Sequence, residues 1–248
     1  MSTPKLSIIT ITFNAQHTLE RTIASVEAQS FPGIEYIIVD GASSDSTPDI
    51  VRRHAGSVSR FVSEPDDGLY FAMNKGLDLA SGDYVWFLNA GDELPSPDTV
   101  ADMFRSHPDA DVYYGHTMIT ADDGSEIGLR RLAPPESLSW RSFAKGMLVS
   151  HQSFVPRRAL CPHYDTSYAF SADFDWCVRI LKASSSIVNT HMTLSRFLDG
   201  GITKQNISRG LRERFRIMCR FYGFLPTLWH HLPIAAHFFA FWLSRGRF

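Results

Sequence analysis

The first 90 residues alternate short apolar runs with segments of helical spacing, and this alternation restricts the possible folds most strongly. Apolar and β-branched residues predict strands over residues 6–13, 34–39, 60–63 and 84–88. Helices are predicted over residues 18–29, from Pro48 onward, and over residues 69–80. Strands that alternate with helices join through right-handed crossovers. The sequence therefore predicts an α/β fold in which helices flank a mainly parallel sheet.

Polar residues follow three of the predicted strands. Asn14 follows the first strand, Asp40 ends the second, and Asp92 lies just past the fourth. The carboxyl ends of parallel strands lie along one edge of a sheet, where ligands bind. We expect these three side chains to face one crevice, although they are far apart in the sequence.

Asp92 lies in the segment Asn89-Ala90-Gly91-Asp92-Glu93, directly after an apolar run typical of a buried strand. A carboxylate in this place suits a hard cation such as Mg²⁺ or Mn²⁺, which takes oxygen ligands and bridges to phosphate oxygens. The alternative is that Asp92 only caps the next helix. The expected convergence with Asn14 and Asp40 favours the metal site.

The second half of the chain is less regular. Helices are predicted over residues 98–105, 170–181 and 211–222. Strands are predicted over residues 110–120 and 150–155, and residues 126–132 are predicted to form a hairpin with the strand at 110–120. Residues 187–197 are predicted to be extended.

Composition excludes some classes of protein. The net charge of −2 argues against a nucleic-acid binder. The three cysteines, Cys161, Cys177 and Cys219, have neither disulfide-framework nor zinc-ligand spacing. The N-terminal segment lacks a basic region and a small-residue cleavage site, so no signal peptide is predicted. A reducing cytoplasm is the expected compartment.

The charge of the C-terminal part differs from that of the rest. Residues 204–248 carry eight basic residues and a single acidic one, Glu213. Residues 225–243 are apolar and aromatic, but two prolines and three histidines argue against a membrane span. The composition favours an anchor at an anionic membrane surface. The alternative is a pair of helices packed on the rest of the chain or on a second subunit.

Five segments in order carry a family resemblance: SIITITFNA, IEYIIVDGASSDST, SEPDDGLYFAMNKGLDLASGDYVWFLNAGDEL, HQSF and SADFDWCVRIL. Together they resemble the family 2 glycosyltransferases, in particular the bacterial exopolysaccharide and O-antigen type. The resemblance covers roughly residues 5–200. It implies a GT-A fold over residues 1–203, followed by a basic and aromatic helical extension over residues 204–248.

The resemblance implies an inverting transfer of a sugar from a nucleotide diphosphate donor, a UDP- or GDP-sugar. The residues that it places along the nucleotide and diphosphate are Thr12, Phe13, Asn14, Asp40, Glu64, Asp66, Asn74, Lys75 and Asn89. Asp40 would accept a hydrogen bond from the base. From the residues alone, the alternative for Asp40 is a loop cap, and the alternative for Lys75 is a solvated helix residue.

The resemblance also implies a metal ligand and a general base. Asp92 matches the metal ligand of the family's Asp-x-Asp motif, but Asn89 stands where the first aspartate would be, which removes one charge from the site. Asp173 matches the general base that takes the proton of the acceptor hydroxyl. The alternative for Asp173 is an acidic residue in the first turn of a helix.

Four further residues are candidates for contact with the acceptor or the diphosphate: His151, Gln152, Asp175 and Trp176. Each has a structural alternative. His151 is a lone histidine beside a strand, Asp175 can pair with Arg179 four residues on, and Trp176 can belong to the core.

The sequence thus predicts an inverting glycosyltransferase with a divalent cation, at the inner face of a bacterial plasma membrane. Its expected acceptor is the hydroxyl of a lipid-linked glycan in surface-polysaccharide or lipopolysaccharide assembly. Two alternatives stay open at this point. One is a degenerate transferase that binds a nucleotide-sugar without turnover, and the other is a nucleotidyltransferase.

Overall fold

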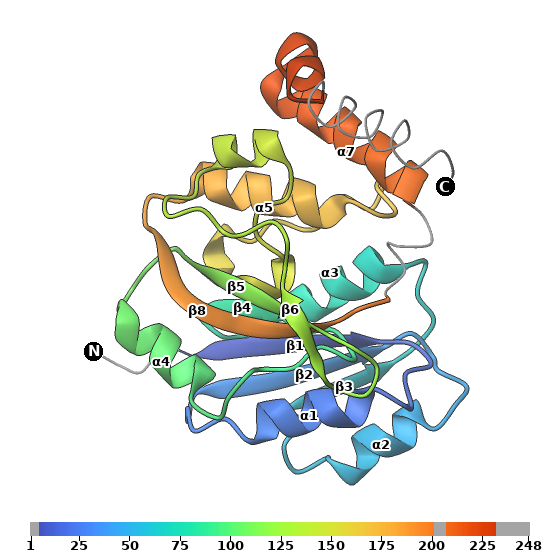
Figure 1. Cartoon of the computed structure of the whole chain (residues 1–248). Coiled ribbons are helices and arrows are strands. Elements are labelled where there is room, and N and C mark those ends of the chain that lie inside the picture. Colours follow the sequence, from blue (N-terminus) through green and yellow to red (C-terminus); the bar gives the residue numbers. More distant parts are fainter. Residues whose placement is uncertain (1–4, 201–206, 232–248) are drawn as a thin grey trace.

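A four-stranded parallel sheet in the order β3-β2-β1-β4 forms one half of the molecule (Figure 1). The structure is a computed structural model that describes residues 5–200 and 207–231. The strands of this sheet are β1 (Leu6–Thr12), β2 (Ile34–Asp40), β3 (Arg60–Ser63) and β4 (Tyr84–Phe87). The crossover helices are α1 (Leu19–Glu27), α2 (Thr47–Arg53) and α3 (Leu69–Leu79). The α/β prediction for this half is therefore confirmed.

Both faces of the sheet are covered, which explains why its strands are continuous apolar runs. Successive residues of β1 point to opposite faces. Ile8 belongs to the apolar core shared with Leu19 and Ile23 of α1, whereas Ile9 belongs to the core shared with Met73 of α3. With helices on both sides, the carboxyl edge of the sheet is where polar loops can reach solvent.

A second, mixed sheet is built around one long strand. Its strands are β5 (Val112–Thr120), β6 (Glu126–Leu129), β7 (Phe154–Pro156) and β8 (Ile187–Leu198). β6 and β7 pair antiparallel with β5, and β8 pairs parallel with it. The predicted hairpin between the segments of β5 and β6 and the extended segment of β8 are both confirmed. Single bridges, Tyr84 to Arg157 and Glu93 to Arg196, connect the two sheets.

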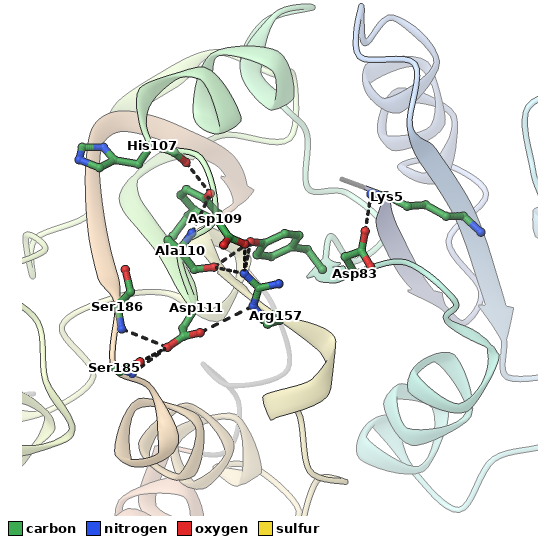
Figure 2. A network of polar contacts seen from close by, with 11 residues as sticks. Lys5, Asp83, His107, Asp109, Ala110, Asp111, Arg157, Ser185 and Ser186 are labelled. Carbon is green, nitrogen blue, oxygen red and sulfur yellow. Dashed lines mark hydrogen bonds and ion pairs between the residues drawn. The ribbon is translucent and has the colours of Figure 1, made fainter. Parts of the chain in front are cut away.

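A polar network around Arg157 holds the junction of the two sheets (Figure 2). The guanidinium of Arg157 donates to Asp109 at 2.5 Å and to the hydroxyl of Tyr84 at 3.0 Å, and its Nε lies 3.7 Å from Asp111. Asp111 in turn accepts the backbone N–H of Ser185, at 2.7 Å, where β8 is about to begin. Arg157 thus ties the end of β7 to β4 and β5.

The remaining helices lie around the second sheet and above the first. They are α4 (Thr99–Ser106), the short 3-10 helices η1 (Trp140–Lys145), η2 (His151–Ser153) and η3 (Arg158–Leu160), and the longer α5 (Ala172–Ala183) and α7 (Ile207–Tyr222).

The strand predicted over residues 150–155 is wrong in its first half. A turn closed by the bond from Ser153 N–H to Ser150 O precedes β7, and β7 pairs with only three residues of β5.

Helix α7 shares a core with the rest of the chain. Ile217 and Met218 are buried in the same apolar cluster as α5, and the Tyr222 ring stacks on Trp140 with centroids 5.6 Å apart. A second helix follows over residues 224–231. The predicted boundary at 203/204 and the segment 232–248 lie outside the described residues. Across residues 5–200 and 207–231, none of the helices is both long and apolar enough to cross a bilayer.

Candidate active site

The loops that follow β1 and β2 are locked together by hydrogen bonds. Asn14 takes a left-handed conformation with φ 48°, and its side-chain oxygen accepts the N–H of Ser44 at 3.0 Å. Its own N–H donates to Ser43 Oγ at 2.7 Å. Asp40 is fully buried and accepts the N–H of Ser43 at 3.0 Å and the hydroxyl of Ser63 at 2.6 Å. In this structure Asp40 shapes the loop, in line with the loop-cap alternative, and its contact with a base stays a prediction.

An exposed aromatic ring lies beside this loop. Phe13 is 65% exposed, although β1 before it is buried. A Cβ atom added to Gly41 would lie 3.3 Å from the Phe13 ring and 3.4 Å from the carboxylate of Asp66. The three residues therefore form one surface with bare backbone in the middle, which is suited to a flat ring. Thr12 lies just inside this surface, and its buried hydroxyl has no hydrogen-bond partner.

Lys75 of α3 is tied to the acidic loop before that helix. Its Nζ lies 2.5 Å from Asp66 and 2.9 Å from Glu64. The hydrogen bond to Asp66, followed by that to Glu64, raises the pKa of Lys75. The lysine thus holds the Asp66 carboxylate beside Gly41 and is not a freely solvated helix residue.

A tight turn after β4 presents Asn89 and Asp92. The N–H of Asp92 donates to the carbonyl of Asn89 at 2.9 Å, and Gly91 between them has φ 102°. A Cβ atom at Gly91 would lie 2.9 Å from a methyl group of Leu198, so the turn requires glycine there. The side-chain oxygen of Asn89 is buried without a hydrogen-bond partner.

Asp92 is 4% exposed, and burial dominates its electrostatics. Its carboxylate accepts a bond from Gln152 Nε2 at 3.1 Å and from the N–H of Leu198 at 3.3 Å. Burial raises the pKa of Asp92. This effect is larger than the opposite effects of the Gln152 hydrogen bond and the His151 charge, so the pKa is about 7. A buried carboxylate with a pKa near neutrality is a frequent feature of functional sites.

The residues of this turn fit a divalent cation. No group of three or more His, Cys, Asp or Glu side chains able to hold a metal occurs in residues 5–200 and 207–231. Asp92 nevertheless offers a carboxylate, and Asn89 offers an amide oxygen that has no hydrogen-bond partner. A cation would favour the ionised form of Asp92 against the effect of burial. Its remaining ligands would have to come from phosphate and water.

Asp173 lies in the first turn of α5. Its carboxylate accepts the N–H of Phe174 at 2.8 Å and the hydroxyl of Tyr70 at 3.3 Å, and it lies 3.5 Å from His151 Nδ1. Burial acts to raise the pKa of Asp173. The hydrogen bond and charge of His151, with a smaller effect from Arg214, outweigh it, so the pKa is lowered overall. Asp173 therefore stays ionised, as a general base must.

The 3-10 helix η2 joins the two carboxylates. His151 lies against Asp173, and the next residue, Gln152, donates to Asp92. The indole N–H of Trp86, on the buried strand β4, donates to the carbonyl of Gln152 at 2.8 Å and holds the short helix in place. Four residues predicted separately are thus brought together in one site.

Three other predicted residues point elsewhere. Asn74 uses both ends of its amide on the backbone of Tyr164, at 2.7 and 3.0 Å. Trp176 is fully buried and donates to the carbonyl of Pro162. Asp175 is fully buried and pairs with Arg179 Nε at 2.7 Å, which confirms the predicted pair. Buried polar side chains need such partners, so these residues support the fold behind the site.

Tyr70 is a site residue that the sequence did not reveal. It is buried, as the aromatic pattern suggests, yet its hydroxyl reaches Asp173, 103 positions away in the chain. No local spacing indicates this contact, because it depends on how α3 and α5 pack.

Comparison with known sequences places this site in a family. The sequence profile of the family described as "Glycosyl transferase family 2" matches residues 7–161. The chain belongs to glycosyltransferase family 2. Two relatives of this family-2 enzyme are an uncharacterised glycosyltransferase of Mycobacterium tuberculosis and a PGL/p-HBAD biosynthesis glycosyltransferase of Mycobacterium bovis. The first is 36% identical over 191 residues, 72% of this chain and 69% of the relative. The second is 28% identical over 234 residues, 89% of this chain and 87% of the relative.

Solved structures show that this family-2 enzyme has the GT-A fold. S. aureus TarS 1-349 in complex with UDP-GlcNAc matches 92% of this chain, and 73% of that chain is covered, with a TM-score of 0.65 and 16% identity. The mannosyltransferase PcManGT of Pyrobaculum calidifontis, in complex with GDP-Man and Mn²⁺, matches 99% of this chain, with 76% of that chain covered, a TM-score of 0.64 and 19% identity. Against the longer TarS chain, the match spans 39% of its length. The predicted fold and transferase class are confirmed.

Proposed function

We propose that this glycosyltransferase moves a sugar from a nucleotide diphosphate donor to an acceptor hydroxyl with inversion at the anomeric carbon. The observation that carries the proposal is the pair of carboxylates joined by η2. Asp92 has a pKa raised to about 7 by burial, and Asp173 has a lowered pKa next to His151. Two carboxylates with opposite shifts suit two different tasks, one at the leaving group and one at the nucleophile.

The nucleotide of the donor would bind across the carboxyl edge of the first sheet. Phe13 offers an exposed ring, and Gly41 leaves the backbone beside it open. The Lys75 pair with Asp66 borders the same surface. Two fold neighbours were solved with UDP-GlcNAc and with GDP-Man, which supports a UDP- or GDP-sugar as donor.

Asp92 and Asn89 would hold a divalent cation, Mg²⁺ or Mn²⁺, and the Mn²⁺ complex of one fold neighbour supports this. When bound, the cation offsets the negative charge that develops on the leaving diphosphate. Gln152 and the Leu198 backbone keep the Asp92 carboxylate in one orientation. Asn89 in place of a carboxylate makes the site less negative, so we expect weaker cation binding without the diphosphate.

Asp173 would accept the proton of the acceptor hydroxyl. One ionised carboxylate on the face opposite the leaving group is sufficient for inversion. Tyr70 and His151 hold this carboxylate from two sides, and both come from elements packed in the core. Their contacts limit its rotation, which favours attack from a single direction.

We further propose a lipid-linked glycan acceptor at a membrane surface, in surface-polysaccharide assembly. Phe224, Leu225, Leu228 and Trp229 occupy one side of the helix over residues 224–231, and Trp229 is 72% exposed. Helix α7, on which this helix packs through Phe215, carries exposed arginines, among them Arg209, Arg212 and Arg216. An exposed apolar face with nearby basic residues suits an anionic bilayer surface. A relative named for PGL/p-HBAD biosynthesis supports a biosynthetic role.

A thermal-shift panel of nucleoside diphosphates and nucleotide-sugars, with and without Mn²⁺ or Mg²⁺, tests the donor site. A ligand that binds only the folded state adds about 2.7 kcal/mol at ~100 times its dissociation constant. We expect one base to stabilise the protein, more strongly with the cation, and Asp92→Asn to abolish the cation's contribution. Nucleotide binding with no sugar transfer to any acceptor would favour the degenerate transferase. No shift with any nucleotide would contradict the proposed donor site.

A further inference from the structure

Helix α7 is fixed directly to the segment that precedes the base Asp173. The carboxylate of Glu213 accepts three consecutive backbone N–H groups, from Ala169 at 3.0 Å, Phe170 at 2.8 Å and Ser171 at 3.0 Å. The hydroxyl of Ser171 donates back to the carbonyl of Gly210 at 3.1 Å. These bonds set the position of α7 relative to the start of α5, and therefore the position of the residue after Glu213.

That residue, Arg214, extends toward the site. Its guanidinium lies 5.7 Å from the centre of the Phe174 ring, and Phe174 adjoins the base. Its Nε is buried without a hydrogen-bond partner. No carboxylate pairs with Arg214 within residues 5–200 and 207–231, although its positive charge contributes to the low pKa of Asp173.

Arg130, just after β6, is a second cation, close enough to Arg214 and Asp173 for their charges to influence it. Its guanidinium donates to the carbonyls of Met147, at 2.8 Å, and Leu132, at 3.3 Å. It pairs with no carboxylate in the described part of the chain. Burial, followed by the charge of Arg214, lowers the pKa of Arg130, while Asp173 opposes this. Arg130 also lines a shallow surface depression, together with His116, Leu148 and Ser150.

The charges of this cluster are not balanced. The charges of two guanidinium groups, Arg130 and Arg214, act at the single carboxylate of Asp173, which the proposed reaction needs as a base. Burying a cation without an anionic partner costs free energy, and a bound anionic ligand offsets this cost. The planar fork of arginine matches the oxygens of a phosphate group in two-point contact.

We propose that Arg130 and Arg214 form a binding site for a phosphate group carried by the acceptor. This inference rests on the proposed function and names the chemistry of its acceptor. The donor diphosphate belongs to the Asp92 side of η2, whereas both arginines lie on the Asp173 side, where the acceptor hydroxyl must be. A phosphate held there would bring a neighbouring hydroxyl of the same molecule to the base.

The test measures binding of geranyl phosphate, geraniol and inorganic phosphate by calorimetry, with the donor site filled by the nucleoside diphosphate and cation that stabilise the protein. We expect geranyl phosphate to bind and geraniol not to bind. Arg130→Gln and Arg214→Gln should each weaken the binding of geranyl phosphate at least about tenfold, since each variant loses a bond between a charged donor and the phosphate. Nucleotide affinity should stay within about twofold of wild type, and Arg214→Lys should restore part of the binding.

Arg105→Gln is the control, because Arg105 is an exposed arginine in the last turn of α4 that pairs with Asp102, outside both proposed binding surfaces. Unchanged binding in both site variants, equal loss in the control, or equal binding of geraniol would overturn the proposal. Equal affinity for inorganic phosphate and geranyl phosphate would support the proposal and show that the site recognises the phosphate group and not the lipid chain. The assay is repeated without nucleotide, so a failure of the proposed donor site and a failure of this phosphate site are told apart.

Discussion

At the residue scale, the burial of Asp92 makes its contribution to the free energy of unfolding depend on pH. Its pKa is raised from 3.8 to about 7, so between these values the folded protein keeps a proton that the unfolded chain has lost. Without a cation, its contribution to the free energy of unfolding is therefore present below about pH 4 and is lost as the pH rises to about 7. The full shift corresponds to roughly 4 kcal/mol.

Asp92→Asn should remove this dependence. We expect the cation-free variant to be more stable than wild type near pH 8, by up to about 4 kcal/mol, and the difference to shrink near pH 4. Urea unfolding at both pH values measures it. Asp49→Asn, in an exposed pair with Arg52, serves as the control. Parallel pH curves for wild type and Asp92→Asn would show that Asp92 is not the titrating group.

Asp173→Asn tests the base. The variant keeps the size of the side chain but cannot take a proton, so we expect turnover to fall at least about 10²-fold with donor affinity unchanged. Tyr70→Phe removes one hydrogen bond to the same carboxylate and should cost less. Rates with donor and a glycan acceptor, alongside nucleotide binding, check both. Near wild-type turnover in Asp173→Asn would exclude it as the base.

His151→Gln should move the pH–rate profile. His151 is the largest influence that lowers the pKa of Asp173 against burial. Its loss should raise that pKa, so the acidic limb of the profile shifts to higher pH while the alkaline limb stays. The other groups that act on Asp173 are Tyr70, Arg214 and Arg130, which the variant leaves in place. An unmoved acidic limb would show that His151 only packs there.

At the scale of elements, α7 acts as a support for the active site rather than a separate tail. Its Glu213 holds the backbone just before α5, and its Ile217 and Met218 are part of the core. We expect Glu213→Ala to leave three backbone N–H groups without their acceptor and to destabilise the protein by about 1–3 kcal/mol. Turnover should fall more than donor affinity, because the segment that carries Asp173 loses its position.

Thermal unfolding and steady-state rates of Glu213→Ala measure this prediction. Glu136→Ala is the control, because Glu136 is an exposed glutamate whose carboxylate lies 3.5 Å from His191 Nε2. If Glu213→Ala and Glu136→Ala behave alike, α7 does not support the site. A chain cut before α7 would lose these contacts, so membrane binding is better tested with point variants.

At the scale of the whole molecule, the active site and the exposed apolar helix belong to one continuous structure. The helix over residues 224–231 packs on α7 through Phe215 and His231, whose rings lie 5.2 Å apart, and α7 packs on α5. A membrane bound at this helix would therefore have a defined position relative to Asp173. That arrangement suits an acceptor whose glycan extends from a lipid surface.

Leu225→Ser combined with Trp229→Ser should reduce membrane binding. Both side chains are largely exposed, so the fold should tolerate the change, while apolar area available to the bilayer is lost. Flotation with vesicles of anionic and of neutral lipids measures it, and we expect wild type to prefer the anionic vesicles. Ile127→Ser, an exposed apolar residue of the β6 hairpin, is the control. Equal flotation of all three proteins would contradict a membrane face at this helix.

The sequence by itself determined the elements and the fold class of this protein. The runs at Leu6–Thr12, Ile34–Asp40 and Tyr84–Phe87 are apolar on both faces, which only a covered parallel sheet accommodates. Strand ends in such a sheet share one edge, so Asn14 and Asp92 could be predicted to lie near ligand chemistry. Local patterns were sufficient here because they depend on neighbouring residues.

Only the tertiary structure decided which candidates meet. It joined Asp92 to Asp173 through Gln152 and His151 and turned Asn74 and Trp176 inward. It also brought Arg214 over the Phe174 ring and Arg130 within electrostatic reach of Asp173. These outcomes depend on how η2, α5 and α7 pack over long sequence separations. A single sequence shows which residues are polar, but whether a polar side chain is satisfied internally or left for a ligand depends on its neighbours in space.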